Sequence, residues 1–232
     1  MNAACHVVLS VVIPTLNAAD VLPATLARLA TARADGLVGE VIVSDGGSTD
    51  RTTEIARAGG ARVCVGSRGR GLQMARGASA ASEQWLLFLH ADTRVEDGWQ
   101  EAVASFTAGR GEDAVAVFTF ALDDASPAAR RLERLVSWRN RWLGLPYGDQ
   151  GLLISRRLYD KVGGFKPLPL MEDVDIVRRL GRSRLVILPV RAITSAVRYR
   201  REGYLRRSSR NLLCLTLWFA GVPPKAIARL YG

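Results

Sequence analysis

Short apolar runs alternate with helical patterns through the first half of the chain. The runs that predict strands are rich in Val, Ile, Leu and aromatic residues and lie at residues 7–14, 40–44, 61–66 and 85–89. Helices are predicted between them, at 19–30, 48–60 and 69–82, from apolar spacing or from cap-type residues at their starts. Strands that alternate with helices of this length are joined by right-handed crossovers into a mostly parallel sheet. The pattern therefore predicts an α/β fold with helices flanking the sheet.

The strand at 85–89 ends abruptly in polar residues. Its sequence, WLLFL, is apolar without a break, which is typical of a strand covered on both faces, because a half-exposed strand would alternate. His90, Ala91, Asp92 and Thr93 follow at once. Open α/β sheets bind ligands just beyond the carboxyl ends of their strands, so Asp92 is predicted to lie at a ligand site.

The second half of the chain has a less regular pattern. Strands are predicted at 114–122, 151–157, 184–189 and 192–199, and helices at 126–144, 171–181 and 203–221. No repeat, linker or low-complexity tract divides the 232 residues, and 48% of them are hydrophobic, enough for a full core. We therefore expect a single domain over 1–232 with a basic helical region at its C-terminal end.

Charge is unevenly distributed along the chain. Residues 1–127 hold 10 Lys and Arg against 15 Asp and Glu, whereas residues 128–232 hold 22 against 7. The halves carry net charges of −5 and +15, which suggests a basic face that meets an anionic membrane surface, a nucleic acid or a phosphorylated substrate. The alternative is simple solvation, with a preference for Arg, since only three of the 32 cations are Lys.

Cysteine spacing and hydropathy indicate the compartment. Cys5, Cys64 and Cys214 have neither metal-like nor paired spacing, which favours a reducing, cytoplasmic location. The N-terminus lacks the features of a secretory signal, and no apolar stretch reaches the roughly 18 residues that a transmembrane helix needs. The region 201–232 joins cations to an apolar helix; it is expected either to pack on the domain or to attach peripherally to the inner face of a membrane.

Polar clusters stand at four element junctions, at residues 14–17, 44–50, 90–93 and 171–175. Each alone is what turns and helix caps are made of. The first three, however, follow predicted strands, and a parallel sheet gathers those strand ends along one edge. No glycine-rich phosphate loop follows the first strand, which weakens dinucleotide and ATPase interpretations. A nucleotide diphosphate would then need a divalent cation on Asp92, with help from Arg68 or Arg70.

Five motifs in this order and spacing, VVIPTLN, VSDGGSTD, FLHADT, GDQGLLISR and MEDVDIVRRL, resemble the family 2 glycosyltransferases, whose nucleotide-sugar-binding fold is called GT-A. The resemblance spans roughly residues 8–200. FLHADT and YGDQG look like a small non-processive subgroup linked to arsenosugar biosynthesis. The resemblance implies a nucleotide-sugar-binding half at 8–122, an acceptor and catalytic half at 123–200, and a C-terminal basic and apolar helix at 201–232.

Site residues follow from the resemblance position by position. It implies that Asp173 is the catalytic base, with Glu172 beside it, and that Asp92 binds a divalent metal, Mn or Mg. The residues implied in nucleotide-sugar binding are Pro14, Thr15, Asn17, Asp45, Arg68, Arg70 and Ala91. Among them, Asp45 is expected to face the nucleobase of the donor. Asp149 and Gln150 are expected on the acceptor side.

Two positions depart from the family pattern. His90 replaces the first Asp of the family's D-x-D element. Gly46 stands directly after Asp45, where the family frequently has a second Asp. A His there can ligate the metal or orient its neighbours, so metal affinity or identity is expected to differ.

The implied reaction is displacement at the anomeric carbon of a nucleotide-diphospho-sugar, preferably of the UDP type, by an acceptor hydroxyl. One base and one face of attack predict inversion, and the cation stabilises the leaving diphosphate. Two alternatives stay open: a nucleotidyltransferase of similar build, and a non-catalytic basic module that binds a membrane or nucleic acid. No nucleic-acid partner is expected of the glycosyltransferase, and the module predicts that Asp45, Asp92 and Asp173 are scattered.

Overall fold

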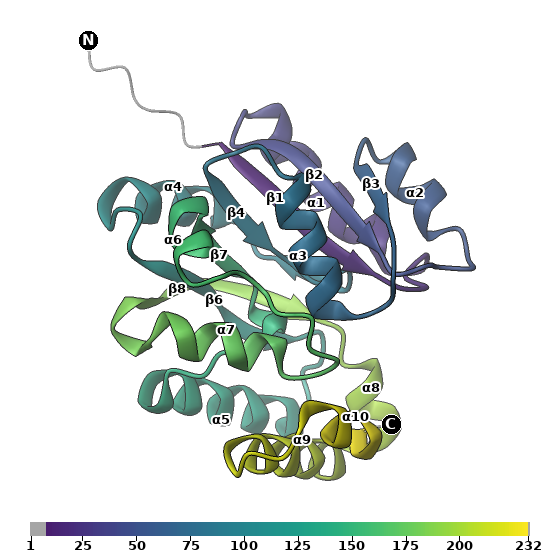
Figure 1. Cartoon of the computed structure of the whole chain (residues 1–232), viewed down its shortest axis with the longest axis vertical. Coiled ribbons are helices and arrows are strands. Elements are labelled where there is room, and N and C mark those ends of the chain that lie inside the picture. Colours follow the sequence, from purple (N-terminus) through teal and green to yellow (C-terminus); the bar gives the residue numbers. More distant parts are fainter. Residues whose placement is uncertain (1–7, 232) are drawn as a thin grey trace.

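The chain folds around one twisted sheet. A computed structural model describes residues 8–231 and contains, in that range, eight strands in the order β3-β2-β1-β4-β7-β6-β8-β5 (Figure 1). The strands are β1 (Leu9–Thr15), β2 (Val38–Asp45), β3 (Arg62–Val65), β4 (Trp85–Phe88), β5 (Thr93–Val95), β6 (Val115–Leu122), β7 (Leu152–Ser155) and β8 (Leu185–Thr194). Cys5 and the first residue of the strand predicted at 7–14 lie outside the described residues.

The first four strands are parallel, as the alternating pattern predicts. β1 pairs with β2 and β4, and β2 pairs with β3, all in parallel. Thr15 at the end of β1 lies opposite Asp45 at the end of β2, and Val12 lies opposite Phe88 at the end of β4. The loops that leave these three strands therefore start from one edge of the sheet.

The other strands make the sheet mixed. β7 runs antiparallel to both β4 and β6, β5 runs antiparallel to β8, and β6 and β8 are parallel. The predicted α/β class with a largely parallel sheet flanked by helices is confirmed. Each antiparallel pair among the described strands includes either β7 or the short β5.

Helices cover both faces of the sheet. They are α1 (Leu22–Ala34), α2 (Thr52–Ala58), α3 (Arg70–Ala80), α4 (Trp99–Gly109), α5 (Pro127–Leu143), α6 (Arg156–Lys161), α7 (Glu172–Leu180), α8 (Val197–Glu202), α9 (Tyr204–Phe219) and α10 (Pro224–Tyr231), with 3-10 turns η1 (Gly148–Gln150) and η2 (Arg182–Arg184). α1, α2 and α4 pack in one core with Leu87, and α3, α6 and α7 pack in the other with Leu86 and Phe88. β4 is therefore buried on both faces, which explains its unbroken apolar sequence.

The last helices form a further layer beside the strand ends. Cys214 and Leu215 of α9 and Ile227 of α10 pack with Leu145 and Val174 in a separate apolar cluster. Figure 1 shows α5, α9 and α10 together at the lower edge of the molecule. Of the two expectations for 201–232, packing on the domain is therefore observed. Within residues 8–231, no helix combines the length and apolarity needed to cross a bilayer.

Several element boundaries differ from the prediction. The two strands predicted at 184–189 and 192–199 are one strand, β8, followed by α8. Pro189 does not end β8, because the pairing with β6 shifts register there: Phe118 pairs with Leu188 and Thr119 with Arg191. An irregularity of this kind accommodates a residue that lacks an N–H donor.

Five α-helices and strands were not predicted, and two predicted strands end early. The elements absent from the sequence prediction are α4, β5, α6, α8 and α10; the helix predicted at 203–221 is α9, and α10 follows it. The strand predicted at 151–157 ends at Ser155, whose hydroxyl accepts a hydrogen bond from Leu158 N and begins α6. A serine cap overrides strand propensity when its oxygen satisfies a helical N–H group.

Candidate active site

A polar pocket of about 140 Å³ lies among segments that are far apart in the sequence. It is lined from the β4–β5 loop, the start of α3, η1, the start of α7, the β8–α8 junction, α9 and α10. The polar lining residues are Arg70, His90, Asp92, Tyr147, Asp149, Asp173, Thr194, Ser195, Arg198, Tyr199, Arg207, Asn211 and Tyr231. Four predicted site residues, Arg70, Asp92, Asp149 and Asp173, and the metal candidate His90 are therefore brought together.

Asp173 lies in the first turn of α7. Met171 precedes that turn in a left-handed conformation, with φ of 65°, and starts the helix at Glu172. The Oδ2 atom of Asp173 accepts a hydrogen bond of 2.9 Å from Gly148 N, which ties α7 to η1. Asp173 thus presents a carboxylate to the pocket from a rigid element.

Glu172 points elsewhere. Its side chain is fully buried and forms an ion pair with Arg70, the first residue of α3. Glu172 is not among the pocket-lining residues, whereas Arg70 is. A buried carboxylate paired with a pocket-lining guanidinium fixes the position of the cation. In this arrangement Glu172 holds Arg70, and Asp173 alone of the two acids reaches the pocket.

His90 and Asp92 lie on the loop after β4. The Nε2 atom of His90 is buried and has no hydrogen-bond partner among the described residues. Burial and the charges of Arg70 and Arg198 lower the pKa of His90 to about 3, so the ring is neutral and keeps a lone pair. A side chain at Gly148 would fill the space in front of this ring, because a Cβ there would lie 2.8 Å from Nε2.

Asp149 and Gln150, both predicted on the acceptor side, behave differently. Asp149 lines the pocket and its Oδ1 atom is buried without a partner among the described residues. Burial raises the pKa of Asp149 to about 6, against the opposing charge of Arg139 and with the help of Asp173 and Asp92. Gln150 is fully buried away from the pocket. Its Nε2 atom donates a hydrogen bond of 3.0 Å to Phe118 O, and its Oε1 atom accepts one of 2.9 Å from Asn140 Nδ2. These bonds hold η1 onto β6 and α5.

Asp45 lies outside the pocket. It is fully buried, and its two oxygens accept hydrogen bonds from the hydroxyls of Thr15 (2.9 Å) and Ser48 (2.5 Å) and from Gly47 N (2.8 Å) and Ser48 N (2.7 Å). Burial raises the pKa of Asp45, but these hydrogen bonds outweigh it and hold the pKa below its usual value. The carboxylate orders the β2–α2 loop from inside.

The remaining predicted nucleotide residues surround that loop. Asn17 is exposed, has φ of 49°, and accepts a 2.9 Å hydrogen bond from Thr49 N, which joins the β1–α1 loop to the β2–α2 loop. Gln73 of α3 donates to Thr15 O (2.6 Å) and Ser44 O (3.0 Å). Pro14 is partly buried at the end of β1, Arg68 is exposed on the β3–α3 loop, and Ala91 is buried in the core. None of these five predicted residues, Pro14, Thr15, Asn17, Arg68 and Ala91, lines the pocket.

The C-terminal elements supply pocket residues that sequence reasoning missed. Arg198 and Tyr199 come from α8, Arg207 and Asn211 from α9, and Tyr231 from α10. Arg207 is buried and forms an ion pair of 2.9 Å with Glu202. It also donates a hydrogen bond of 3.3 Å to the hydroxyl of Tyr231. The only signal in the sequence was the density of Arg in this region, and that signal does not distinguish a pocket wall from a solvated face.

Comparison with known proteins bears on what this pocket does. The family model described as glycosyl transferase family 2 matches residues 10–168, more than half of the chain. The chain belongs to glycosyl transferase family 2. Membership confirms the predicted family and enzyme class, and the subgroup linked to arsenosugar biosynthesis stays a prediction. The matched range includes β1 to β7 and the loops that carry Arg70, His90, Asp92 and Asp149, and it ends before Asp173.

Curated relatives of this family 2 chain share only part of it. The PGL/p-HBAD biosynthesis glycosyltransferases of Mycobacterium bovis and Mycobacterium tuberculosis are 41% identical over 90 residues, which is 36% of this chain and 34% of the relative. The chain thus matches about a third of the length of these relatives.

Solved structures share the fold over nearly the whole chain. Glucosyl-3-phosphoglycerate synthase from Mycobacterium tuberculosis, in complex with Mn²⁺, UDP and glucosyl-3-phosphoglycerate, aligns with a TM-score of 0.63 at 24% identity, covering 93% of this chain and 81% of that one. A complex of the same synthase with Mg²⁺ and UDP aligns with a TM-score of 0.63, 24% identity and coverages of 93% and 80%. These likenesses confirm the predicted GT-A fold.

Proposed function

We propose that the chain transfers a sugar from a nucleotide-diphospho-sugar to an acceptor hydroxyl, with inversion at the anomeric carbon. The observation that carries the proposal is the convergence of Asp173, Asp92 and Arg70 on one pocket in a family 2 chain. A carboxylate base, a metal-binding carboxylate and a cation for the diphosphate are the groups that this displacement requires.

The donor is expected to be a UDP-sugar. The synthase that shares the fold was solved with UDP and with UDP-glucose, which supports this choice. In this chain the nucleoside would lie against the joined β1–α1 and β2–α2 loops, where Asn17 is exposed at the carboxyl end of the sheet. The diphosphate would then extend into the pocket, toward Arg70 and Arg198.

His90 and Asp92 are the residues that would hold a divalent metal, Mn or Mg. The carboxylate of Asp92 suits such ions, and the buried, unpartnered Nε2 atom of His90, which lines the same pocket, would add a nitrogen donor. Among the described residues no group of three His, Cys, Asp or Glu is close enough to hold a metal alone. Cations of this class commonly complete their coordination with substrate phosphates, so the residues fit. The bound ion would stabilise the charge of the departing nucleotide diphosphate.

Asp173 is proposed as the base. Its Oδ2 is oriented by Gly148 N, and its place in the first turn of α7 presents the carboxylate to the pocket, so it can accept the proton of an acceptor hydroxyl. The hydroxyl oxygen attacks the anomeric carbon, the bond to the diphosphate breaks, and the electron pair leaves with the diphosphate. Arg70, held by Glu172, and Arg198 supply positive charge in the same pocket.

The acceptor is proposed to enter beside Asp149. This side chain lines the pocket with an oxygen that has no partner among the described residues, so it can hydrogen-bond a second acceptor hydroxyl. Gln150 contributes indirectly by holding η1 in place.

The two alternatives are less well supported. A nucleotidyltransferase lacks its usual phosphate loop here. The scattering that a non-catalytic basic module predicts holds for Asp45, which lies outside the pocket, but not for Asp92 and Asp173, which both line it.

Replacing the base tests the proposal. Asp173→Asn keeps the shape of the side chain but removes proton acceptance, so release of UDP from UDP-glucose and other UDP-sugars, by an acceptor or slowly by water, should fall by about 100-fold or more. The stabilisation of the fold by UDP with Mn²⁺ should stay near the wild-type value, because the nucleotide does not need the base.

The matched control is Asp175→Asn, also on α7. Asp175 pairs with Arg179 at 2.6 Å and does not line the pocket, so turnover should remain close to wild type. Equal loss of turnover and of UDP binding in Asp173→Asn would contradict the role as base. A wild-type chain that neither binds nor cleaves any UDP-sugar would refute the proposed function.

A further inference from the structure

The helix α5 leaves an apolar stripe uncovered. Leu135, Trp138 and Trp142 follow helical spacing along its outer side, and the two tryptophans are 57% and 58% exposed. Val136 and Asn140, on the opposite side of the helix, are buried. Trp and Leu are costly to leave in water, and a repeated stripe of them is unlike the scattered apolar residues of an ordinary surface.

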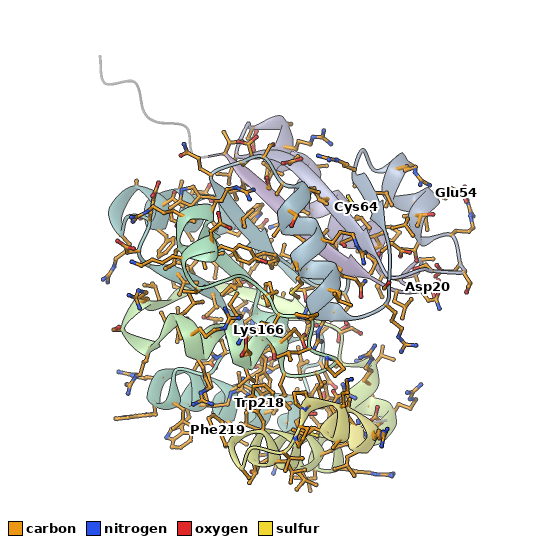
Figure 2. All side chains as sticks on the ribbon, in the orientation of Figure 1. Asp20, Glu54, Cys64, Lys166, Trp218 and Phe219 are labelled. Carbon is orange, nitrogen blue, oxygen red and sulfur yellow. The ribbon has the colours of Figure 1, made fainter. Side chains whose placement is uncertain are left out.

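The neighbouring helix α9 carries a second stripe. Its residues Leu205, Leu212, Leu213 and Phe219 are all large, apolar and exposed. α9 packs beside α5 and lies with it at the lower edge of the molecule (Figure 1). Figure 2 shows Phe219 at the lower margin of the molecule. We call these two stripes together the α5/α9 face.

The other side of α9 belongs to the pocket. Arg207 and Asn211 line the pocket from α9, whereas Leu212 and Leu213, next along the chain, are exposed. The exposed stripe therefore has no role in lining the site. Within the described part of the chain, its Phe219 ring is contacted by the guanidinium of Arg178, 5.0 Å from the ring centroid, and Leu205, Leu212 and Leu213 stay largely open to solvent.

Positive charge surrounds the α5/α9 face. Segments 127–143 and 203–231 together contain ten Lys and Arg and a single acid, Glu133. Arg131, Arg134 and Arg141 are exposed on α5 and interleave with the apolar stripe, and Arg206 is exposed on α9. By contrast, the acids Asp20 and Glu54 lie at the right of the view, on the β1–α1 loop and on α2, away from the lower edge where α5 and α9 lie (Figure 2).

We propose that the α5/α9 face docks the chain on the surface of an anionic lipid bilayer. Aromatic and leucine side chains would enter the headgroup region, and the arginines would pair with lipid phosphates and carboxylates. Interfacial helices use this combination of an apolar stripe, tryptophan and flanking cations. The excess of arginine identifies an anionic bilayer as the partner, since neither a second copy of this basic face nor a neutral membrane complements the charge.

Vesicle binding by the whole chain tests the proposal. Co-sedimentation is measured with phosphatidylcholine vesicles and with vesicles that also contain phosphatidylserine. Binding should require phosphatidylserine and weaken with added salt. Trp138→Ala/Trp142→Ala should lower the partition coefficient roughly tenfold or more, because the apolar contribution is lost. Arg134→Gln/Arg141→Gln should lower it by about tenfold as well, through the lost charge.

Matched controls come from the rest of the surface. Val65→Ala/Leu72→Ala removes exposed apolar side chains on β3 and α3, outside the α5/α9 face, and Arg57→Gln/Arg110→Gln removes two exposed arginines on α2 and after α4. Both should bind like wild type. Thermal melting checks that each variant is folded. Quenching of wild-type tryptophan fluorescence by brominated lipid gives a readout that needs no variant.

Several results would overturn the docking proposal. Equal binding to the two kinds of vesicle, wild-type binding by the tryptophan variant, or absence of lipid quenching would each do so. Sedimentation equilibrium that finds a dimer, converted to monomer by Trp138→Ala/Trp142→Ala, would assign the face to a second copy of the chain instead. None of these measurements depends on sugar transfer, so the proposal fails or stands apart from the proposed function.

Discussion

Asp45 illustrates how one buried carboxylate can join the loops that leave two neighbouring strands. It accepts four hydrogen bonds from Thr15, Gly47 and Ser48 and is sealed from solvent. Its partners belong to the ends of β1 and β2 and to the loop after β2, so the loops that follow these parallel strands are held together by one charge. A buried carboxylate is stable only with hydrogen bonds of this kind.

Removing this charge should destabilise the fold. Asp45→Asn is expected to lower the free energy of unfolding by about 1–2 kcal/mol at neutral pH, because charge-assisted hydrogen bonds are replaced by weaker ones. The hydrogen bonds lower the pKa of Asp45 in the folded state, so this stabilisation is present above the ordinary carboxyl pKa of 3.8 and is lost as pH falls through the folded-state pKa. The difference between wild type and variant should therefore shrink in acid.

Urea denaturation at several pH values measures the effect. Asp20→Asn, in the exposed β1–α1 loop, is the control and should match wild type. An unfolding free energy of Asp45→Asn equal to that of wild type at neutral pH would contradict the structural role.

At the scale of elements, the position of α3 decides where Arg70 lies. α3 packs closely on β1, because Gly77 lets the helix backbone approach Val12; a Cβ at Gly77 would lie 2.3 Å from Val12 Cγ1. Val is stiff at χ1, so it cannot turn away easily. The small residues of the predicted helix 69–82 are therefore a packing requirement, and they bring Arg70 within reach of Glu172.

Enlarging that contact should displace the helix. Gly77→Ala is expected to cost about 1–3 kcal/mol of unfolding free energy, despite the better helix propensity of Ala, because overpacking exceeds the propensity gain. Gly109→Ala, at the end of α4 with no atom within 4 Å of the added Cβ, is the matched control and should be neutral or slightly stabilising. Denaturation curves of equal midpoint for the two variants would show that α3 has room to move.

At the scale of the whole molecule, the pocket is assembled from segments between residues 70 and 231. Arg70 comes from α3, the helix that follows the parallel strand β3, Asp149 and Asp173 come from the second half of the chain, and Arg207 and Tyr231 from the terminal helices. A ligand that touches all of them stabilises the fold as a unit, because it binds only the folded chain.

Metal removal should therefore weaken stabilisation by nucleotide. UDP at about 100 times its Kd should stabilise the fold by about 2.7 kcal/mol, or roughly 5–10 °C in Tm. We expect this shift with Mn²⁺ and a smaller one in EDTA. Without the ion, the proposed metal ligands His90 and Asp92 have no means of holding the diphosphate. Asp92→Asn should lose the metal-dependent part, whereas Asp160→Asn, an exposed carboxylate on α6, should keep it. Identical shifts with and without metal would argue against Asp92 as a ligand.

The sequence by itself determined the alternation of strands and helices in the first half, the burial of β4 on both faces and the family. It also identified Asp92, Asp149, Asp173 and Arg70 as residues for one site. These inferences depend on local periodicity and on motifs, and parallel strands place their ends together whatever the details of packing.

Only the tertiary structure decided which polar residues face the pocket. Asp45 and Gln150 turn inward to satisfy buried backbone and side-chain groups, and Glu172 pairs with Arg70, because a buried polar atom must find a partner wherever the fold supplies one. The arginines and tyrosines of α8 to α10 reach the pocket only because those helices pack back on the domain, through contacts between residues that are distant in sequence and leave no local pattern.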